Sequence, residues 1–148
     1  MENSITVLCV KDIELIAPLW EKLNSQHYAK SVNFKDHFSR QTFEARSTKW
    51  RSLPENSVHI GVARDENGAV VGYCVCSAQG ETGELDSIYI KPEYRGRETG
   101  SKLAADGIAW LKEKGCRHID VLLAEGNEAV FPFYEKLGFR VRGTVLRI

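Results

Sequence analysis

Residues 91–98 lie between a predicted strand and a predicted helix and combine glycine with basic side chains. Gly96, and Gly100 just beyond it, let the backbone come close to a ligand. The first N–H groups of a helix have no partners within that helix, and together with the helix dipole they attract phosphate or pyrophosphate. The segment is therefore a candidate anion-binding site; the alternative is an ordinary strand-to-helix turn with solvated charges. The basic side chains around it are Arg95, Arg97 and Lys102.

Two common phosphate-binding motifs do not describe this loop. Three residues separate Gly96 from Gly100, fewer than separate the glycines of a Walker A loop. Lys102 also follows Ser101, whereas the Walker A lysine precedes its Ser or Thr. The GxGxxG pattern of dinucleotide-binding loops is absent from the sequence as well.

The sequence has four cysteines, which are candidates for metal or redox chemistry. Cys74 and Cys76 are closer together than the cysteines of a zinc knuckle, and no histidine follows at ligand spacing. Positions two apart on a strand share one face, so this pair predicts buried, reduced thiols. We therefore expect no metal site in this chain.

Hydrophobic periodicity predicts the elements that position these residues. Alternating apolar residues at 5–9 predict a first strand, and helical spacing follows over 11–23 and, more loosely, over 34–53. Two β-branched runs at 58–64 and 69–78 flank an Asp-Glu-Asn-Gly turn signal, which predicts a hairpin.

The second half of the chain alternates strands and helices. Hairpins followed by βαβα units predict an α/β (α+β) fold, in which a mixed central sheet has helices on both faces. The full predicted order is β-α-α-β-β-β-α-β-α-β. Its later elements are a strand at 84–90, a helix ending near Gly115, a strand at 118–123, a helix at 128–137 and a last strand from Phe139 onward.

Length and composition predict a single globular domain over residues 1–148, with 43% apolar and 27% charged residues. Twenty Lys and Arg balance 20 Asp and Glu, so the basic excess typical of a nucleic-acid-binding protein is missing. No apolar stretch approaches the ~20 residues that span a bilayer, and the N-terminus lacks a secretory pattern. We therefore expect a cytoplasmic protein without nucleic-acid or membrane partners.

Two motifs in this sequence resemble those of the GCN5-related N-acetyltransferase (GNAT) family. The acetyl-CoA loop of that family reads Arg/Gln-x-x-Gly-x-Gly/Ala after a strand and a proline, and residues 92–101 are similar to it. The second motif, an Asn, a Tyr and a closing Gly-Phe, resembles Asn127, Tyr134 and Gly138–Phe139. The resemblance implies a GNAT fold. It also implies direct transfer of an acetyl group from acetyl-CoA, as co-substrate, to a primary amine of a small molecule or protein.

The resemblance further implies roles for individual residues. Tyr134 would be the general acid for the departing CoA thiolate, and a core aromatic is its structural alternative. Glu84 would be the general base, with Asp86 on the same strand face as the runner-up, and a solvated strand end is the alternative for both. The implied acetyl-CoA-binding residues are Ile88, Tyr89, Ile90, Arg95, Gly96, Arg97, Glu98, Thr99, Gly100, Ser101, Asn127 and Lys136.

Two features depart from the family pattern. Glu98 stands where the family has its first motif glycine, which leaves open a catalytically degenerate GNAT-fold module that binds acyl-CoA. Only nine residues follow Phe139, so one strand is expected to be missing, or to come from a partner chain in a homodimer. The acceptor amine is not identified by the sequence. The residues expected near it are His27, Tyr28, Phe34, His37 and Phe38.

Overall fold

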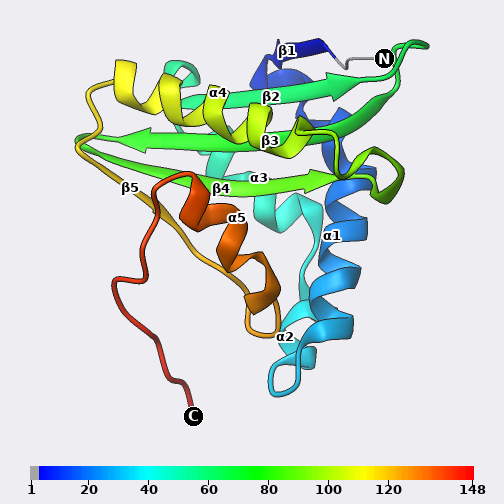
Figure 1. Ribbon diagram of the computed structural model, residues 1–148, viewed down its shortest axis with the longest axis vertical. Coiled ribbons are helices and arrows are strands. Elements are labelled where there is room, and N and C mark those ends of the chain that lie inside the picture. The colour runs from blue at the N-terminus through cyan, green and yellow to red at the C-terminus, as the bar shows by residue number, and fades with distance from the viewer. Residues whose placement is uncertain (1–3) are drawn as a thin grey trace.

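The computed structural model describes residues 4–148, which contain one five-stranded sheet in the order β1-β2-β3-β4-β5 (Figure 1). Neighbouring strands pair antiparallel except β4 and β5, which pair parallel. Residues 1–3, which belong to the predicted domain and to the stretch compared with secretory signals, lie outside the described residues. The strands are β1 (Ser4–Leu8), β2 (Val58–Arg64), β3 (Val70–Gln79), β4 (Thr82–Ile90) and β5 (His118–Val121).

Helices cover both faces of this sheet, as predicted (Figure 1). On one face, α1 and α3 bury Trp20 and Trp50 against the strands. On the other face, α4 and α5 bury Leu103 and Tyr134. The α+β architecture with a mixed sheet is therefore confirmed. The helices are α1 (Ala17–Lys30), which follows a 3₁₀ turn at Val10–Ile16, then α2 (Lys35–Arg40), α3 (Phe43–Ser52), α4 (Thr99–Glu113) and α5 (Phe131–Lys136).

Two local predictions are confirmed in detail. The β2–β3 hairpin turns at Gly68, whose φ is +84°, and the Asp65 carboxylate accepts hydrogen bonds from the backbone N–H groups of Asn67 and Ala69 at 2.8 and 2.9 Å. Cys74 and Cys76 are buried free thiols on one face of β3, with their Sγ atoms 3.9 Å apart.

A β-bulge interrupts β4. Val75 of β3 pairs with Ser87, and Cys76 pairs with Leu85, which leaves Asp86 as an extra residue on β4. The parallel pairing with β5 also ends at Leu85. Beyond this point β4 continues to Ile90, whereas β5 ends at Val121. The backbone groups of β4 that point away from β3 therefore have no β5 partner after the bulge.

The predicted helix over 34–53 is wrong in one respect, because the chain divides it into α2 and α3. Gln41 and Thr42 are extended between them, and the Thr42 hydroxyl caps α3 by accepting a hydrogen bond from Ala45 N at 3.1 Å. A threonine competes well for this N-cap position, and the competition ends the preceding helix.

The predicted last strand is also wrong. Residues 139–148 form no strand, and in Figure 1 the red C-terminal segment leads away from the sheet. The Arg140 guanidinium donates hydrogen bonds to the carbonyls of Glu135 and Phe139 at 3.1 and 2.8 Å, which holds the chain at the end of α5. Alternating apolar residues form a strand only where backbone groups find a partner. Similarly, β5 ends at Val121 rather than at residue 123.

Candidate active site

A cleft of about 310 Å³ opens where β4 diverges from β5. Its walls come from α1, α2, the first turns of α3, the bulged part of β4, the loop after β5, and Tyr134 of α5. In Figure 1, α2 and α5 lie below β4, and α1 runs down the right side of the view beside them. Chain segments that are far apart in the sequence therefore meet around the bulge.

The anion loop predicted from the sequence leads from β4 to the N-terminus of α4. Gly96 has a φ of +76°, and Glu98, which precedes the helix, has a φ of +63° and a ψ of +5°. Glu98 is the one non-glycine residue with positive φ among residues 4–148. Its side chain is exposed and makes no capping hydrogen bond to the first turn of the helix.

The arginines of this loop lie over neighbouring aromatic rings. Arg95 donates a hydrogen bond from Nε to the Ile90 carbonyl at 2.9 Å, and its guanidinium lies 5.2 Å from the centre of the Tyr89 ring. Arg97 lies 5.4 Å from the Tyr94 ring centre. These contacts restrict where the two guanidinium groups lie beside the loop.

The bulge places Asp86 in the cleft. Its carboxyl group is fully buried, Oδ1 accepts a hydrogen bond from Lys49 Nζ at 2.6 Å, and its backbone carbonyl accepts one from Arg46 at 2.7 Å. Oδ2 has no partner among the described residues. Burial and the neighbouring Glu84 carboxylate raise the pKa of Asp86 to about 6. Asp86 is therefore a proton acceptor near neutral pH.

Glu84 lies differently. Its side chain is 38% exposed, accepts a hydrogen bond from Lys49 Nζ at 3.0 Å, and does not line the cleft. The neighbouring Asp86 carboxyl group and the Lys49 ammonium lower the pKa of Glu84. A low pKa makes a carboxylate a weaker base, so the geometry favours Asp86, the runner-up from the sequence, over Glu84.

Tyr134 lines the cleft from α5 and is 8% exposed. Phe133 and Phe139 meet its ring edge-on, with centroids 5.0 and 5.8 Å away. Burial raises the pKa of Tyr134, so the phenol keeps its proton and is a hydrogen-bond donor at neutral pH. Tyr134 can therefore be a packed core aromatic and a proton donor at the same time, so the structural alternative does not exclude the predicted role.

The structure brings together only part of the predicted site. Asn127 and Ile88 line the cleft, whereas Tyr89 and Ile90 are buried in the two cores and Lys136 is exposed on α5. The roles assigned to these residues stay predictions. Of the residues expected near the acceptor, His27, His37 and Phe38 line the cleft, and Tyr28 and Phe34 do not.

Sequence reasoning missed Lys49 and Arg46, which hold Asp86 from α3. They are three residues apart and therefore lie on one helix face, a spacing that predicts a shared direction but names no partner. It also missed Trp20 and Gln41 in the cleft wall. These four residues precede the recognised motifs, and only the fold brings them to β4.

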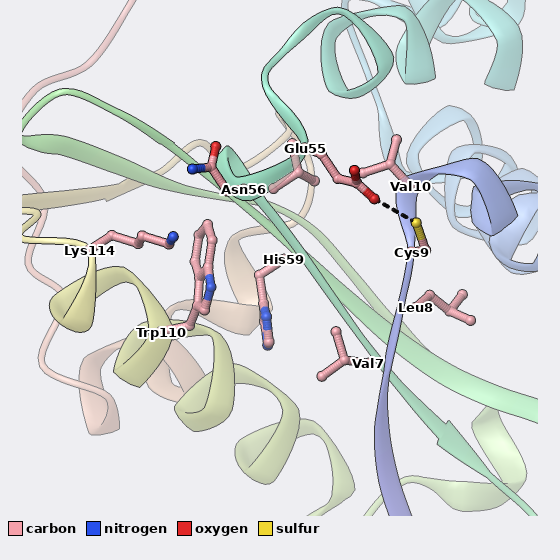
Figure 2. A pocket seen from close by; sticks show the side chains of 10 residues that line it. Val7, Leu8, Cys9, Val10, Glu55, Asn56, His59, Trp110 and Lys114 are labelled. Atoms are coloured by element: carbon pink, nitrogen blue, oxygen red, sulfur yellow. Dashed lines mark hydrogen bonds between the residues drawn. The ribbon is translucent and has the colours of Figure 1, made fainter.

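A second pocket of about 370 Å³ lies on the side of the sheet covered by α4, away from every predicted site residue (Figure 2). His59 contacts Asp106 at 2.7 Å and stacks on Trp110, with ring centroids 5.2 Å apart. Across the pocket, Cys9 donates a hydrogen bond to Glu55 at 2.9 Å. Hydrogen bonds within the protein therefore occupy much of its polar lining.

Within residues 4–148, no three His, Cys, Asp or Glu side chains gather closely enough to hold a metal ion. No helix in the same range has the length and apolar character needed to cross a membrane.

The model of the acetyltransferase (GNAT) family matches residues 18–139, and the chain belongs to this family. An uncharacterised N-acetyltransferase of Methanocaldococcus jannaschii is 29% identical over 86 residues, which are 53% of this chain and 38% of that protein. The mycothiol acetyltransferase of Propionibacterium freudenreichii subsp. shermanii is 34% identical over 87 residues, 56% of this chain and 28% of that protein. The matched part thus spans well under two thirds of either relative.

A likeness to solved structures extends over the whole fold. The crystal structure of PaiA N-acetyltransferase from Thermoplasma acidophilum, in complex with coenzyme A, superposes with a TM-score of 0.73 at 21% identity. The match covers 98% of this chain and 94% of that one. At this identity the match shows a shared fold.

Proposed function

We propose that this chain is an N-acetyltransferase that moves the acetyl group of acetyl-CoA directly to a primary amine of a small molecule or protein. The observation that carries the proposal is the shared cleft of Asp86 and Tyr134, a proton acceptor and a proton donor at the divergent end of β4. Membership of the acetyltransferase family and the coenzyme A complex of a protein with the same fold support it.

The residues present fit acetyl-CoA. The N-terminus of α4, whose first residues are Thr99, Gly100 and Ser101, attracts the pyrophosphate through the helix dipole, and Gly96 keeps the loop free of a side chain there. Beyond Leu85, β5 no longer covers the edge of β4, and this edge would contact the amide-containing pantetheine arm. When bound, acetyl-CoA supplies an activated thioester. Asn127 and Lys136 are proposed to add contacts to it.

Two cleft residues then accept and donate the protons that the reaction transfers. As the new C–N bond forms, the amine nitrogen becomes positively charged and acidic, and Asp86 accepts the proton that it loses. As the C–S bond breaks, the Tyr134 hydroxyl donates a proton or a hydrogen bond to the departing sulfur. The amine attacks as the neutral base, after its ammonium form has lost one proton to solvent. Asp86 then takes one proton from the nitrogen and Tyr134 gives one to the sulfur, and proton exchange with solvent restores both side chains.

The test measures release of the CoA thiol from acetyl-CoA in the presence of a panel of primary amines. We expect Tyr134→Phe to lower kcat by about 100-fold because it removes the proton donor but keeps the buried ring. Tyr28→Phe is the matched control, since that exposed tyrosine lies outside the cleft. Equal rates for wild type and Tyr134→Phe would remove the tyrosine from the mechanism.

The acyl-CoA-binding module remains the alternative, and the strained Glu98 is the observation that favours it. Calorimetric titration of acetyl-CoA into wild type and Glu98→Gly separates the two functions when combined with the thiol assay. Saturable binding without turnover of any amine would support the module. Turnover by wild type, with similar affinities for the two proteins, would show that Glu98 does not impair the site.

A further inference from the structure

The acceptor side of the cleft has an apolar and aromatic wall. Trp20 and Leu23 of α1 and Phe38 of α2 line it, and the Phe38 ring contacts His27 with centroids 5.5 Å apart. The side-chain amide of Asn24 donates a hydrogen bond to the Phe38 carbonyl at 2.9 Å, which fixes α2 against α1. Burial, together with nearby Lys30, lowers the pKa of His27, so its imidazole is neutral at pH 7 and adds no cation to the wall.

The charges around the cleft suit one ammonium group. Among the lining residues that the structure describes, Asp86 is the single carboxylate. Its Oδ2 atom is buried without a partner, and a buried carboxylate oxygen is stabilised by an N–H donor. Arg46 also lines the cleft, and its fixed positive charge disfavours a second ammonium nearby. A polycation would therefore meet one attractive group, the Asp86 carboxylate, and one repulsive group, the Arg46 guanidinium.

A bridge of contacts joins the loop after β5 to the end of α1, beside the cleft residue Asn127. Glu125 accepts hydrogen bonds from the Ser31 hydroxyl and from the backbone N–H of Val32, the latter at 2.8 Å. Lys30 donates to the Asn127 side chain at 3.2 Å. Gly126, with a φ of +91°, lies so close that an added Cβ would stand 2.3 Å from the Lys30 carbonyl oxygen. The two segments therefore touch backbone to backbone, which fixes the loop that carries the cleft residue Asn127 against the end of α1.

From these three observations we infer that the acceptor is a small primary monoamine with an apolar, aromatic or branched aliphatic body. Its ammonium group meets Asp86, and its body lies against Trp20, Leu23 and Phe38. The inference rests on the proposed acetyltransferase function and narrows its substrate class. The cleft of about 310 Å³, which must also admit the acetyl end of the donor, is at the lower limit of small-molecule sites.

The experiment compares four acceptors in the thiol-release assay: 2-phenylethylamine, spermidine, kanamycin and a short peptide with a free N-terminal alanine. We expect kcat/KM for 2-phenylethylamine to exceed each of the others by about tenfold or more, a difference typical of an apolar pocket. A higher kcat/KM for spermidine, kanamycin or the peptide would overturn the inference and leave the acetyltransferase function intact. If the protein binds acetyl-CoA but releases no CoA thiol with any of the four amines, both proposals would be contradicted.

A gain-of-function variant tests the charge argument. Gln41→Glu adds a second carboxylate to the cleft wall, and we expect it to raise kcat/KM for spermidine by about fivefold. The decisive quantity is the ratio of the two kcat/KM values, spermidine over 2-phenylethylamine, which should rise because a monoamine has no second ammonium to use. Phe38→Ala should raise KM for 2-phenylethylamine by about tenfold, whereas Leu15→Ala, an exposed apolar residue outside the cleft, should not. An unchanged ratio in Gln41→Glu, or an unchanged KM in Phe38→Ala, would contradict the inference.

Discussion

Lys49 sets the working pH of the cleft if Asp86 is the base. Its ammonium group lies 2.6 Å from Asp86 Oδ1 and 3.0 Å from Glu84 Oε2, and its side chain is 32% exposed. Burial opposes the charge on Lys49, but the hydrogen bonds with the two carboxylates raise its pKa overall. Lys49 is therefore cationic throughout the working range, and its charge favours the ionised form of Asp86.

We predict that Lys49→Met moves the acid limb of the kcat/KM profile to higher pH. The wild-type limb should lie near pH 6, where the pKa of Asp86 lies, because activity requires the ionised carboxylate. Removing an ammonium group at this distance disfavours the ionised form and raises the pKa of Asp86, moving the limb upward by about one to two pH units. Both carboxylates titrate as a pair, so the limb reports the pair.

Other charged and titratable groups near Asp86 also affect its pKa. Glu84 on β4 and Lys49 and Arg46 on α3 lie beside Asp86, and His27, His37 and Tyr134 line the same cleft. Arg46 remains in the variant, so part of the positive potential remains, and this limits the expected movement.

The assay is thiol release from acetyl-CoA between pH 5 and pH 9 in constant ionic strength, with the variant divided by the wild type at each pH. The division cancels the titration of the amine substrate itself. Lys49→Arg keeps the charge and should keep the acid limb of the wild type, and thermal melts confirm that each variant is folded. An acid limb that stays in place in Lys49→Met, or that moves to lower pH, would refute the role of Lys49 and Asp86.

Two further predictions concern the backbone around the site. Glu98→Gly should raise the free energy of unfolding by about 1 kcal/mol, because Glu98 has a positive φ that costs a side-chain residue about that much; Glu98→Ala keeps the Cβ and should not. Equal melting temperatures for the two would contradict the strain. Gly126→Ala should lower the free energy of unfolding by about 2 kcal/mol, since the new Cβ would meet the Lys30 carbonyl, whereas Gly143→Ala, with open space around it, should change it little. Denaturant unfolding measures both free energies. An unchanged free energy of unfolding in Gly126→Ala would show that the contact between the loop after β5 and Lys30 adjusts at little cost.

The sequence predicts the fold well where the signal is local. The Asn-Gly turn between β2 and β3 requires no distant contact, and neither does the glycine loop that runs into α4. The last strand was wrongly predicted because alternation in residues 139–148 reports only a tendency, and Arg140 instead binds the end of α5. In the site, Tyr134 was predictable from its motif. The preference for Asp86 over Glu84 was not, because a bulge and a lysine from α3 decide it.

The bulge in β4 also determines which side chains on either side of it point to the same face of the sheet. Leu85 and Ile88 are three positions apart, yet both pack into the core beneath α4, where a regular strand would place them on opposite faces. Asp86 is the residue that makes up the difference. Substituting it therefore removes the carboxylate while the strand keeps its phase, whereas deleting it would turn one half of β4 over. A substitution at residue 86 can remove the carboxylate and keep the fold, but a deletion of residue 86 would disrupt the fold.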